Sequence, residues 1–225
     1  MVIIPQWDPE LSAAEIRRTA ALGGRAIAFS ENPTLLGLPS WHTEYWDPVF
    51  AAAQEASMPI CLHIGSSSQV IDHSADSPYP VHVSVVGCNS MVAAVDLVYS
   101  PVFDKFPNLL CVMSEGEAGW APHALERMDW AWERHRFHAE CTLTSPPSGV
   151  FKEHIYLCVI GDDHAVANRH TIGVDHLLWE SDYPHMDTTW PHTRKILEAT
   201  LADVPDDEAT MIAETNARRV FRWDA

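Results

Sequence analysis

The run Leu177-Leu178-Trp179-Glu180-Ser181-Asp182 carries the pattern that decides the fold. Its apolar positions predict a strand over residues 176–180 that is buried on both faces, as strands of a parallel sheet are. Asp182 follows directly where this strand ends. That placement is typical of (β/α) barrels, in which reactive groups follow the carboxyl ends of the strands.

Five similar runs precede this one, each followed by a stretch with helix signals. They cover residues 2–5, 25–29, 59–64, 108–113 and 154–160. Asp8-Pro9 and Asp47-Pro48 each predict a helix start with an N-cap carboxylate, and residues 120–137 predict a long amphipathic helix. Strands that alternate with helices in this way leave two architectures, an open doubly wound sheet or a (β/α) barrel.

The residues at the six predicted strand exits favour the barrel. Five exits present a carboxylate and the other presents His63. In a barrel all these ends converge on one mouth. The sequence contains neither the glycine-rich dinucleotide fingerprint nor the phosphate-binding loop that would support nucleotide binding by a doubly wound sheet. We therefore expect a single domain over residues 1–225 with an α/β, TIM-type barrel architecture.

Composition and charge exclude several classes of protein. The chain is 47% hydrophobic and 20% charged, as soluble globular proteins are. Its 14 Lys and Arg stand against 31 Asp and Glu, and the net charge of −17 argues against nucleic acid or an anionic membrane as a partner. The apolar runs are expected to be too short to span a bilayer. The expected partner is therefore a small-molecule substrate.

Cysteine usage indicates a reducing compartment. The five cysteines are scattered without a Cys-x-x-Cys motif, and the first residues do not resemble a secretion signal, so we expect a cytoplasmic protein. Cys61, Cys111 and Cys158 lie within predicted strands and are expected to pack in the core.

The strand exits supply the candidate site residues. Asp182 is expected to be functional, and His63 lies inside an apolar strand, where an imidazole needs a partner or a metal. Glu31 either lines the pocket or caps the next turn. Asp8 and Asp162 are expected to be helix caps or loop residues.

Two further residues are candidates for substrate contact. His185, three residues after Asp182, either orients the substrate or lies on a surface loop. Trp120 is expected near the mouth, together with Trp41, Trp46 and Trp190, either as an aromatic wall or as ordinary core packing.

Several segments together resemble the amidohydrolase-related family of the metal-dependent hydrolase superfamily, which includes aminocarboxymuconate-semialdehyde decarboxylase and related carboxy-lyases. The two most specific segments are Leu62-His63-Ile64-Gly65 and Ser181-Asp182-Tyr183-Pro184-His185. Ser30-Glu31-Asn32-Pro33 and Ser114-Glu115-Gly116 add to them, and the resemblance extends from Val2 to about Phe221.

The resemblance implies a TIM-type barrel with a divalent metal, usually zinc, at its mouth. His63 matches the metal-binding histidine of the family's fifth strand, and Asp182 matches the aspartate of its eighth. Glu115 stands where many members carry a histidine, and we expect it to support the site or to shuttle protons. The sequence contains no Asp/Glu-x-His-x-His motif, which the family carries on its first strand.

The resemblance and the length together predict about six of eight βα units. At about 35 residues per unit, eight units need about 280 residues, whereas the chain has 225. We therefore expect that the first two units are lacking, that Met1 corresponds to an internal position of the family, and that the exposed sheet edges favour a homo-oligomer or poor solubility.

These features lead to one expected function and two alternatives. The expected function is that of a metal-dependent hydrolase or carboxy-lyase acting on a small organic acid or amide, with catalytic roles for His63, Glu115 and Asp182. The first alternative is a degenerate, non-catalytic barrel that has lost its metal site. The second is a serine hydrolase that uses one of the residues 66–68, although no Gly-x-Ser-x-Gly motif surrounds them.

Overall fold

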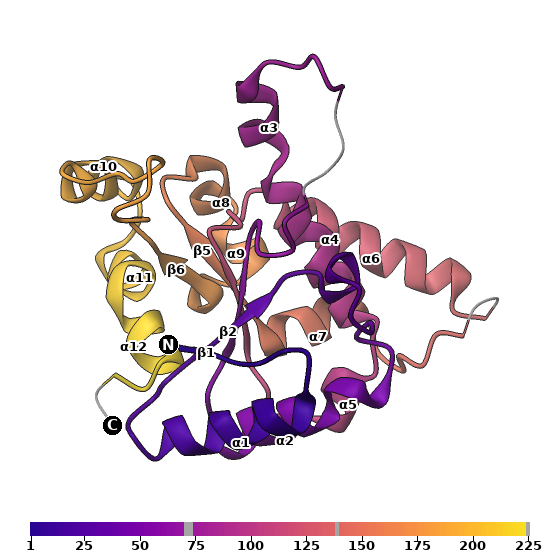
Figure 1. The fold of residues 1–225 in the computed structure, drawn as a ribbon. Coiled ribbons are helices and arrows are strands. Elements are labelled where there is room, and N and C mark those ends of the chain that lie inside the picture. The colour runs from indigo at the N-terminus through magenta and orange to yellow at the C-terminus, as the bar shows by residue number, and fades with distance from the viewer. Residues whose placement is uncertain (70–73, 138–139, 224–225) are drawn as a thin grey trace.

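The computed structural model describes residues 1–69, 74–137 and 140–223. A sheet of six parallel strands lies at its centre, and helices surround the sheet (Figure 1). The strands are β1 (Val2–Ile3), β2 (Ile27–Ser30), β3 (Ile60–His63), β4 (Cys111–Ser114), β5 (Ile155–Val159) and β6 (Leu177–Trp179). All six predicted strands are confirmed, with small differences at their ends.

The strand order identifies the architecture. Neighbouring strands follow the order of the chain from β1 to β6, and every pair is parallel. A doubly wound sheet reverses its order at a switch point, whereas a (β/α) barrel adds each strand beside the one before it. The fold is therefore an incomplete TIM-type barrel of six parallel strands with alternating helices.

Helices connect the strands and cover the outside of the sheet, and α1 and α2 pack side by side (Figure 1). The α-helices are α1 (Pro9–Ala20), α2 (Asp47–Glu55), α3 (Tyr79–Val85), α4 (Gly87–Val98), α5 (Val102–Lys105), α6 (Ala121–His135), α7 (Pro147–His154), α8 (Asp163–Ala167), α9 (Arg169–Ile172), α10 (Thr193–Thr200), α11 (Asp206–Thr210) and α12 (Asn216–Val220). Short 3-10 helices η1 (Pro33–Leu36), η2 (Glu44–Trp46) and η3 (Val174–His176) and a π-helical turn η4 (Met211–Thr215) complete the set.

The two predicted Asp-Pro helix starts turned out differently. Asp8 caps α1, because its carboxylate accepts the N–H groups of Glu10 and Leu11 at 3.1 and 3.0 Å. The prediction of a cap at Asp47 was wrong. Asp47 is itself the first residue of α2, and its carboxylate instead binds Lys105 Nζ at 2.9 Å.

Side chains alternate between the two faces of the sheet and form two apolar clusters. The larger cluster lies between the sheet and the helices, and Cys111 belongs to it. The smaller one lies on the opposite face and includes Cys61 and Cys158. All three of these thiols are buried and free, which confirms their predicted place in the core.

The tryptophans of the two Trp-Asp-Pro tripeptides occupy opposite environments. Trp46 is 0% exposed, stacks edge-on against Phe29 and Tyr45, and donates its indole N–H to the carbonyl of Pro39 at 2.8 Å. Trp7, by contrast, is 75% exposed. The repeated tripeptide therefore gives one core residue and one surface residue.

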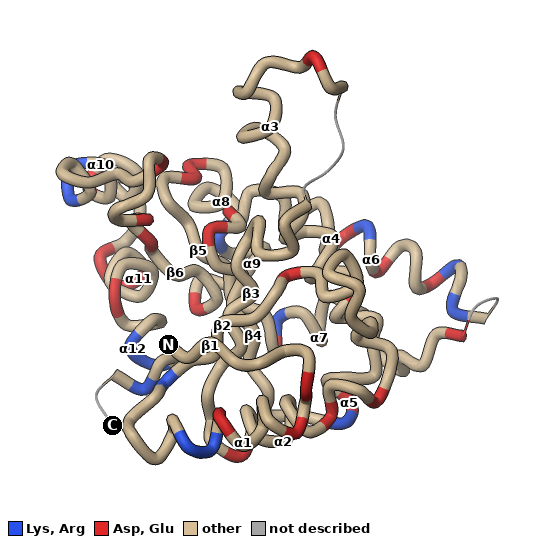
Figure 2. Tube along the Cα trace, viewed as in Figure 1, with Lys and Arg blue, Asp and Glu red and all other residues tan. Residues whose placement is uncertain are grey.

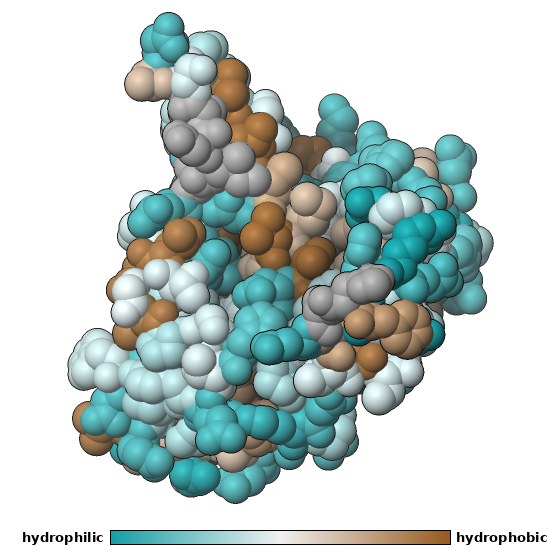
Figure 3. All heavy atoms as spheres, turned by 90° about the vertical axis from the view of Figure 1, so that its right-hand side faces the viewer, coloured by the Kyte–Doolittle hydropathy of each residue, from teal (hydrophilic) through white to brown (hydrophobic). Residues whose placement is uncertain are grey.

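The helical segment Tyr79–Val98, which comprises α3 and α4, is long and apolar enough to cross a membrane by length and composition alone. The prediction that every apolar run is too short was wrong by this measure. Several α4 residues pack in the core, as in a core helix of a globular protein, but α3 has no buried residue. In Figure 3 apolar atoms are visible on the projecting segment that carries α3.

The excess of acidic residues is spread over the molecule. Figure 2 shows Asp and Glu on many elements, whereas Lys and Arg are fewer and lie largely on helices such as α1, α6, α10 and α12. Ion pairs form mostly within one helix or between neighbouring helices. In one example, Arg17 Nη2 of α1 lies 3.0 Å from Glu55 Oε2 of α2. At such exposed positions each pair contributes little to stability.

We expect Trp46→Ala to lower the free energy of unfolding by about 3–5 kcal/mol, because it empties a fully buried aromatic site. Trp7→Ala is the matched control from the same tripeptide and is expected to change it by less than about 0.5 kcal/mol. Urea denaturation of both variants measures the difference. Equal losses in the two variants would contradict the burial described above.

Candidate active site

The exits of the inner strands place the candidate residues around one hollow. Because β2, β3 and β4 are parallel and in register, His63 lies between Ser30 and Ser114 at the end of the sheet. A cavity of about 880 Å³ opens there. Of the predicted site residues, the following line it: His63, Glu115, Trp120, Asp182 and His185.

His63 is oriented by hydrogen bonds at both ring nitrogens. Its Nδ1 lies 2.7 Å from the carbonyl oxygen of Ile64, and its Nε2 lies 2.8 Å from Glu115 Oε1. The hydrogen bond to Glu115 raises the pKa of His63 to about 9, which outweighs the opposite effect of burial. With Nδ1–H donated to a backbone carbonyl, Nε2 is the nitrogen that could bind a metal ion, and it could do so only after losing the proton that it donates to Glu115.

Glu115 connects His63 with Asp182. Its carboxylate accepts a hydrogen bond from His63, and this bond lowers the pKa of Glu115 more than burial raises it. The Glu115 carboxylate also interacts with the carboxyl group of Asp182, which lowers the pKa of Glu115 and raises that of Asp182. The Glu115 backbone has a left-handed φ of 57°, and its N–H donates to Glu180 Oε2 at 3.0 Å.

Asp182 is a buried residue of the site that lies between Glu115 and His185. Its side chain is only 6% exposed, and its Oδ2 lies 2.8 Å from Nδ1 of His185. Burial and the neighbouring Glu115 carboxylate raise the pKa of Asp182. The two shifts run in opposite directions, so of the two carboxyl groups Asp182 has the higher affinity for a proton.

Glu117 lies beside these residues and was missed as a site residue, although it stands two positions after Glu115. Burial first, and then the Asp162 carboxylate, raise the pKa of Glu117 to about 7, and its Oε2 is buried without a hydrogen-bond partner. Asp162 is the N-cap of α8, as predicted, because its carboxylate accepts the backbone N–H of Ala165 at 2.9 Å. The same carboxylate also accepts the backbone N–H of Gly119 at 2.6 Å.

Glu180 was also not predicted as a site residue, although the alternation of side chains along the strand indicates where it points. Residues two apart on a strand share a face, so Glu180 follows Leu178 of the smaller apolar cluster into the barrel interior. Burial raises the pKa of Glu180 above its usual range. Its carboxylate lies beneath the site and holds the backbone of Glu115.

The structure does not place Glu31 at the cavity, so the prediction that it lines the pocket and contacts the substrate, one of its two possible roles, was wrong. Glu31 is 0% exposed, because its carboxylate is enclosed by Ser66 and Ser67. Trp120 does line the cavity, with its indole N–H donated to Gly116. Trp41 and Trp46 belong to the core, and Trp190 is 60% exposed.

The serine-hydrolase alternative requires a free nucleophile among residues 66–68. The Ser66 hydroxyl lies 2.5 Å from Glu31 Oε2, and that of Ser67 lies 2.7 Å from Glu31 Oε1. Both of these hydroxyls therefore serve to hold the loop, which argues against Ser66 and Ser67 as nucleophiles.

Metal donors are present but do not form a complete set. His63 Nε2 and the Asp182 carboxylate supply one nitrogen and one oxygen ligand. Within residues 1–69, 74–137 and 140–223, no group of three or more His, Cys, Asp or Glu side chains is arranged to hold a metal ion. Since a catalytic zinc needs three protein ligands, these residues fit only part of such a site.

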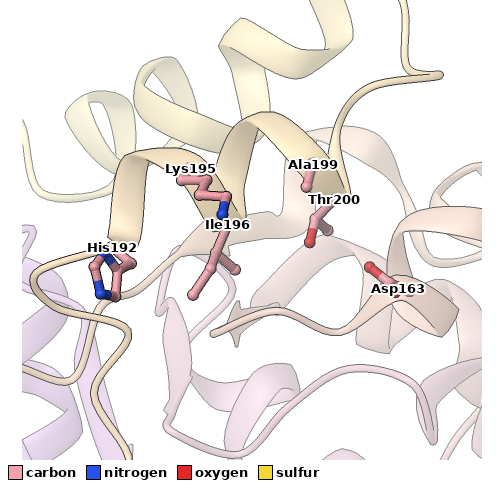
Figure 4. Close-up of a pocket in the computed structure, with 6 residues that line it drawn as sticks. All are labelled: Asp163, His192, Lys195, Ile196, Ala199 and Thr200. Carbon is pink, nitrogen blue, oxygen red and sulfur yellow. The ribbon is translucent and has the colours of Figure 1, made fainter.

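A second hollow of about 440 Å³ lies between α10 and the start of α8. Figure 4 shows His192, Lys195 and Ile196 along one side, with Asp163 across from Thr200. None of the predicted site residues lines it. The candidate chemistry is therefore confined to the larger cavity.

Three solved structures of other proteins are similar in fold to this chain. A 5-carboxyvanillate decarboxylase from Sphingomonas paucimobilis is 22% identical with a TM-score of 0.79, and the match covers 99% of this chain and 66% of that one. An amidohydrolase from Mycobacterium avium subsp. paratuberculosis is 20% identical with a TM-score of 0.82, over 97% and 57%. A dihydroxybenzoic acid decarboxylase from Polaromonas sp., with bound manganese and the inhibitor 2-nitroresorcinol, is 20% identical with a TM-score of 0.74, over 99% and 68%.

The chain thus spans between 57% and 68% of the length of these three proteins. No protein of curated function matches the sequence. The family model described as Amidohydrolase, however, matches residues 1–223. The chain therefore belongs to the amidohydrolase family.

Proposed function

We propose that the protein is a metal-dependent hydrolase or carboxy-lyase that acts on a small organic acid or amide. The observation that carries this proposal is the convergence of two hydrogen-bonded pairs, His63 with Glu115 and Asp182 with His185, on one cavity at the mouth of the barrel. Both reaction types need polarisation of a carbonyl or carboxyl group and a side chain that moves one proton.

A divalent metal ion would be held by His63 Nε2 and the Asp182 carboxylate, with further ligands needed to complete its coordination. When bound, it would supply positive charge that polarises a carbonyl or carboxyl oxygen of the substrate. The family resemblance favours zinc, and the manganese in the similar decarboxylase makes Mn²⁺ the second ion to test. The site is otherwise rich in carboxylates, so a cation is also favoured electrostatically.

Asp182 is the residue that we expect to move the proton. Its raised pKa brings the carboxyl group closer to neutral pH, where a group can both accept and return a proton. In hydrolysis, Asp182 would take a proton from the attacking water. In loss of CO₂, it would deliver a proton to the carbon that had carried the carboxylate. His185, at 2.8 Å, would stabilise the ionised form.

The walls of the cavity offer contacts for the organic part of the substrate. Trp120 lines the cavity, and so do Tyr79 and Val83 of α3. His185 is more than half exposed and could turn toward a bound molecule. We propose Trp120 and His185 as the substrate-binding residues of the predicted set.

A non-catalytic barrel is the second candidate, and one observation favours it. Among the described residues no three donors are arranged around one point. A protein that keeps the fold without the metal would show this arrangement too. Metal content therefore decides between the two candidates.

We expect the purified protein to retain about one divalent ion per chain after incubation with ZnCl₂ or MnCl₂ and desalting, measured by elemental analysis. Asp182→Asn is expected to weaken retention at least tenfold, since it removes a ligand charge. Asp163→Asn, in the hollow against α10, is the control and should bind like the wild type. Metal-free wild-type protein under all conditions would overturn the proposal in favour of the non-catalytic barrel.

The pairing of His63 with Glu115 makes stability depend on pH in a defined direction. Because the folded-state pKa of His63 is raised to about 9, the stabilisation is complete below about pH 6.5 and is lost as the pH rises through about 9. Glu115→Gln is expected to return the His63 pKa toward about 6.5 and to remove this dependence. NMR titration of the imidazole signals in metal-free protein, together with urea unfolding between pH 6 and 10, measures both effects.

Asp96→Asn is the control for that titration. It removes the contact between Asp96 and His42, another pair of His and carboxylate at 2.9 Å, and should leave the His63 titration unchanged. A His63 titration that is the same in the wild type and in Glu115→Gln would show that the carboxylate does not govern the imidazole.

A further inference from the structure

We propose that Glu31 is a positioning residue that fixes the turn carrying His63 and thereby aims His63 Nε2 into the cavity. The role assigned to His63 as a metal ligand rests on the proposed function, but the orientation of its ring can be measured without it.

The Glu31 carboxyl group is unusual in its burial. Its residue follows β2 directly and has no exposed surface. Glutamate is seldom fully buried unless its oxygens are bound, because desolvation of the carboxyl group costs free energy. A buried carboxyl group therefore needs specific neighbours that donate hydrogen bonds to its oxygens.

Those neighbours all belong to the turn that follows His63. Glu31 Oε2 accepts hydrogen bonds from the Ser66 hydroxyl at 2.5 Å and the Ser67 backbone N–H at 2.9 Å. Glu31 Oε1 accepts a hydrogen bond from the Ser67 hydroxyl at 2.7 Å. The backbone N–H of Glu31 also lies 3.2 Å from Ser66 Oγ. Hydrogen bonds thus tie the residue that follows β2 to the turn that follows β3.

The hydrogen bonds of Glu31 act on His63 through the backbone of the turn. Ser66 donates its N–H to the carbonyl of His63 at 3.2 Å, and its hydroxyl oxygen lies 2.5 Å from the same carbonyl. Gly65 supplies the left-handed φ of 75° that the turn requires. The carbonyl of Ile64, inside this turn, accepts the Nδ1–H of His63 at 2.7 Å. The direction of that carbonyl therefore sets the direction of the ring together with the hydrogen bond from Nε2 to Glu115.

The far end of the segment is held separately. The Ser67 hydroxyl lies 3.1 Å from the carbonyl of Gln69, and Asn89 of α4 donates to the same carbonyl at 2.8 Å. Loss of Glu31 would therefore free the part of the turn next to His63 while α4 still held the part near Gln69. A change confined to His63 is the expected consequence.

Two substitutions at Glu31 separate positioning from bulk stability. In Glu31→Gln the amide oxygen can accept from Ser66 and from the Ser67 N–H, and the amide nitrogen can donate to the Ser67 hydroxyl, whose proton then serves Gln69. Glu31→Ala removes all these bonds. We expect the His63 Nδ1–H signal and the ring ¹⁵N shifts, recorded in metal-free protein, to match the wild type in Glu31→Gln and to change in Glu31→Ala.

Metal affinity supplies a second readout. By analogy with residues that support metal ligands, Glu31→Ala should weaken Mn²⁺ binding about 10- to 100-fold, and Glu31→Gln should stay within about threefold of the wild type. If the wild type binds no Mn²⁺, the proposed function fails, while the His63 spectra still test the positioning role.

The chain offers a matched control with the same chemistry elsewhere. Asp129 accepts the Ser148 N–H at 2.9 Å and the Ser148 hydroxyl at 2.6 Å, between α6 and α7. Asp129→Ala should lower stability without moving the His63 signals. If Glu31→Ala does not fold, Ser66→Ala removes the hydroxyl shared with Glu31 and should shift the His63 signals in a milder form. His63 spectra unchanged in a folded Glu31→Ala variant, or in Ser66→Ala, would overturn the inference.

Discussion

The parallel register of β2, β3 and β4 is the constraint on which the site depends. It aligns Ser30 with His63 and His63 with Ser114, so that the residues immediately after these strands emerge at one edge. The hydrogen bonds of the sheet thus bring together groups from distant parts of the chain, such as His63 and Glu115. Side-chain contacts refine the position of these groups, but the backbone hydrogen bonds between the parallel strands bring them together.

The titratable groups at this end of the sheet influence one another's proton affinity. Glu115 binds His63 on one side and Asp182 on the other, and the pKa values of its two partners are both raised. The buried carboxyl group of Glu180 adds a further negative charge beneath them. A site built in this way responds as a unit, because a change in the charge of one member alters the proton affinity of the next.

Much of this arrangement could be predicted from local pattern. Buried strands, the cap at Asp8 and the convergence of His63 with Asp182 follow from hydrophobic runs, Asp-Pro signals and the geometry of parallel strands. The role of Asp47 could not be read in the same way, because its competing partner Lys105 lies far along the chain. Glu31 was likewise misjudged, since nothing local shows that two serines of the next strand exit would enclose it. Contacts between distant residues decide such cases.

The left-handed backbone of Glu115, Glu117 and Asp182 has a consequence for the evolution of this scaffold. Each such residue costs about 1–3 kcal/mol relative to relaxed geometry, and glycine would remove that cost. The replacement would also delete three of the carboxyl groups that line the cavity. Stability and activity are thus opposed at these positions, and selection for thermal robustness alone would drive the barrel toward an inert form.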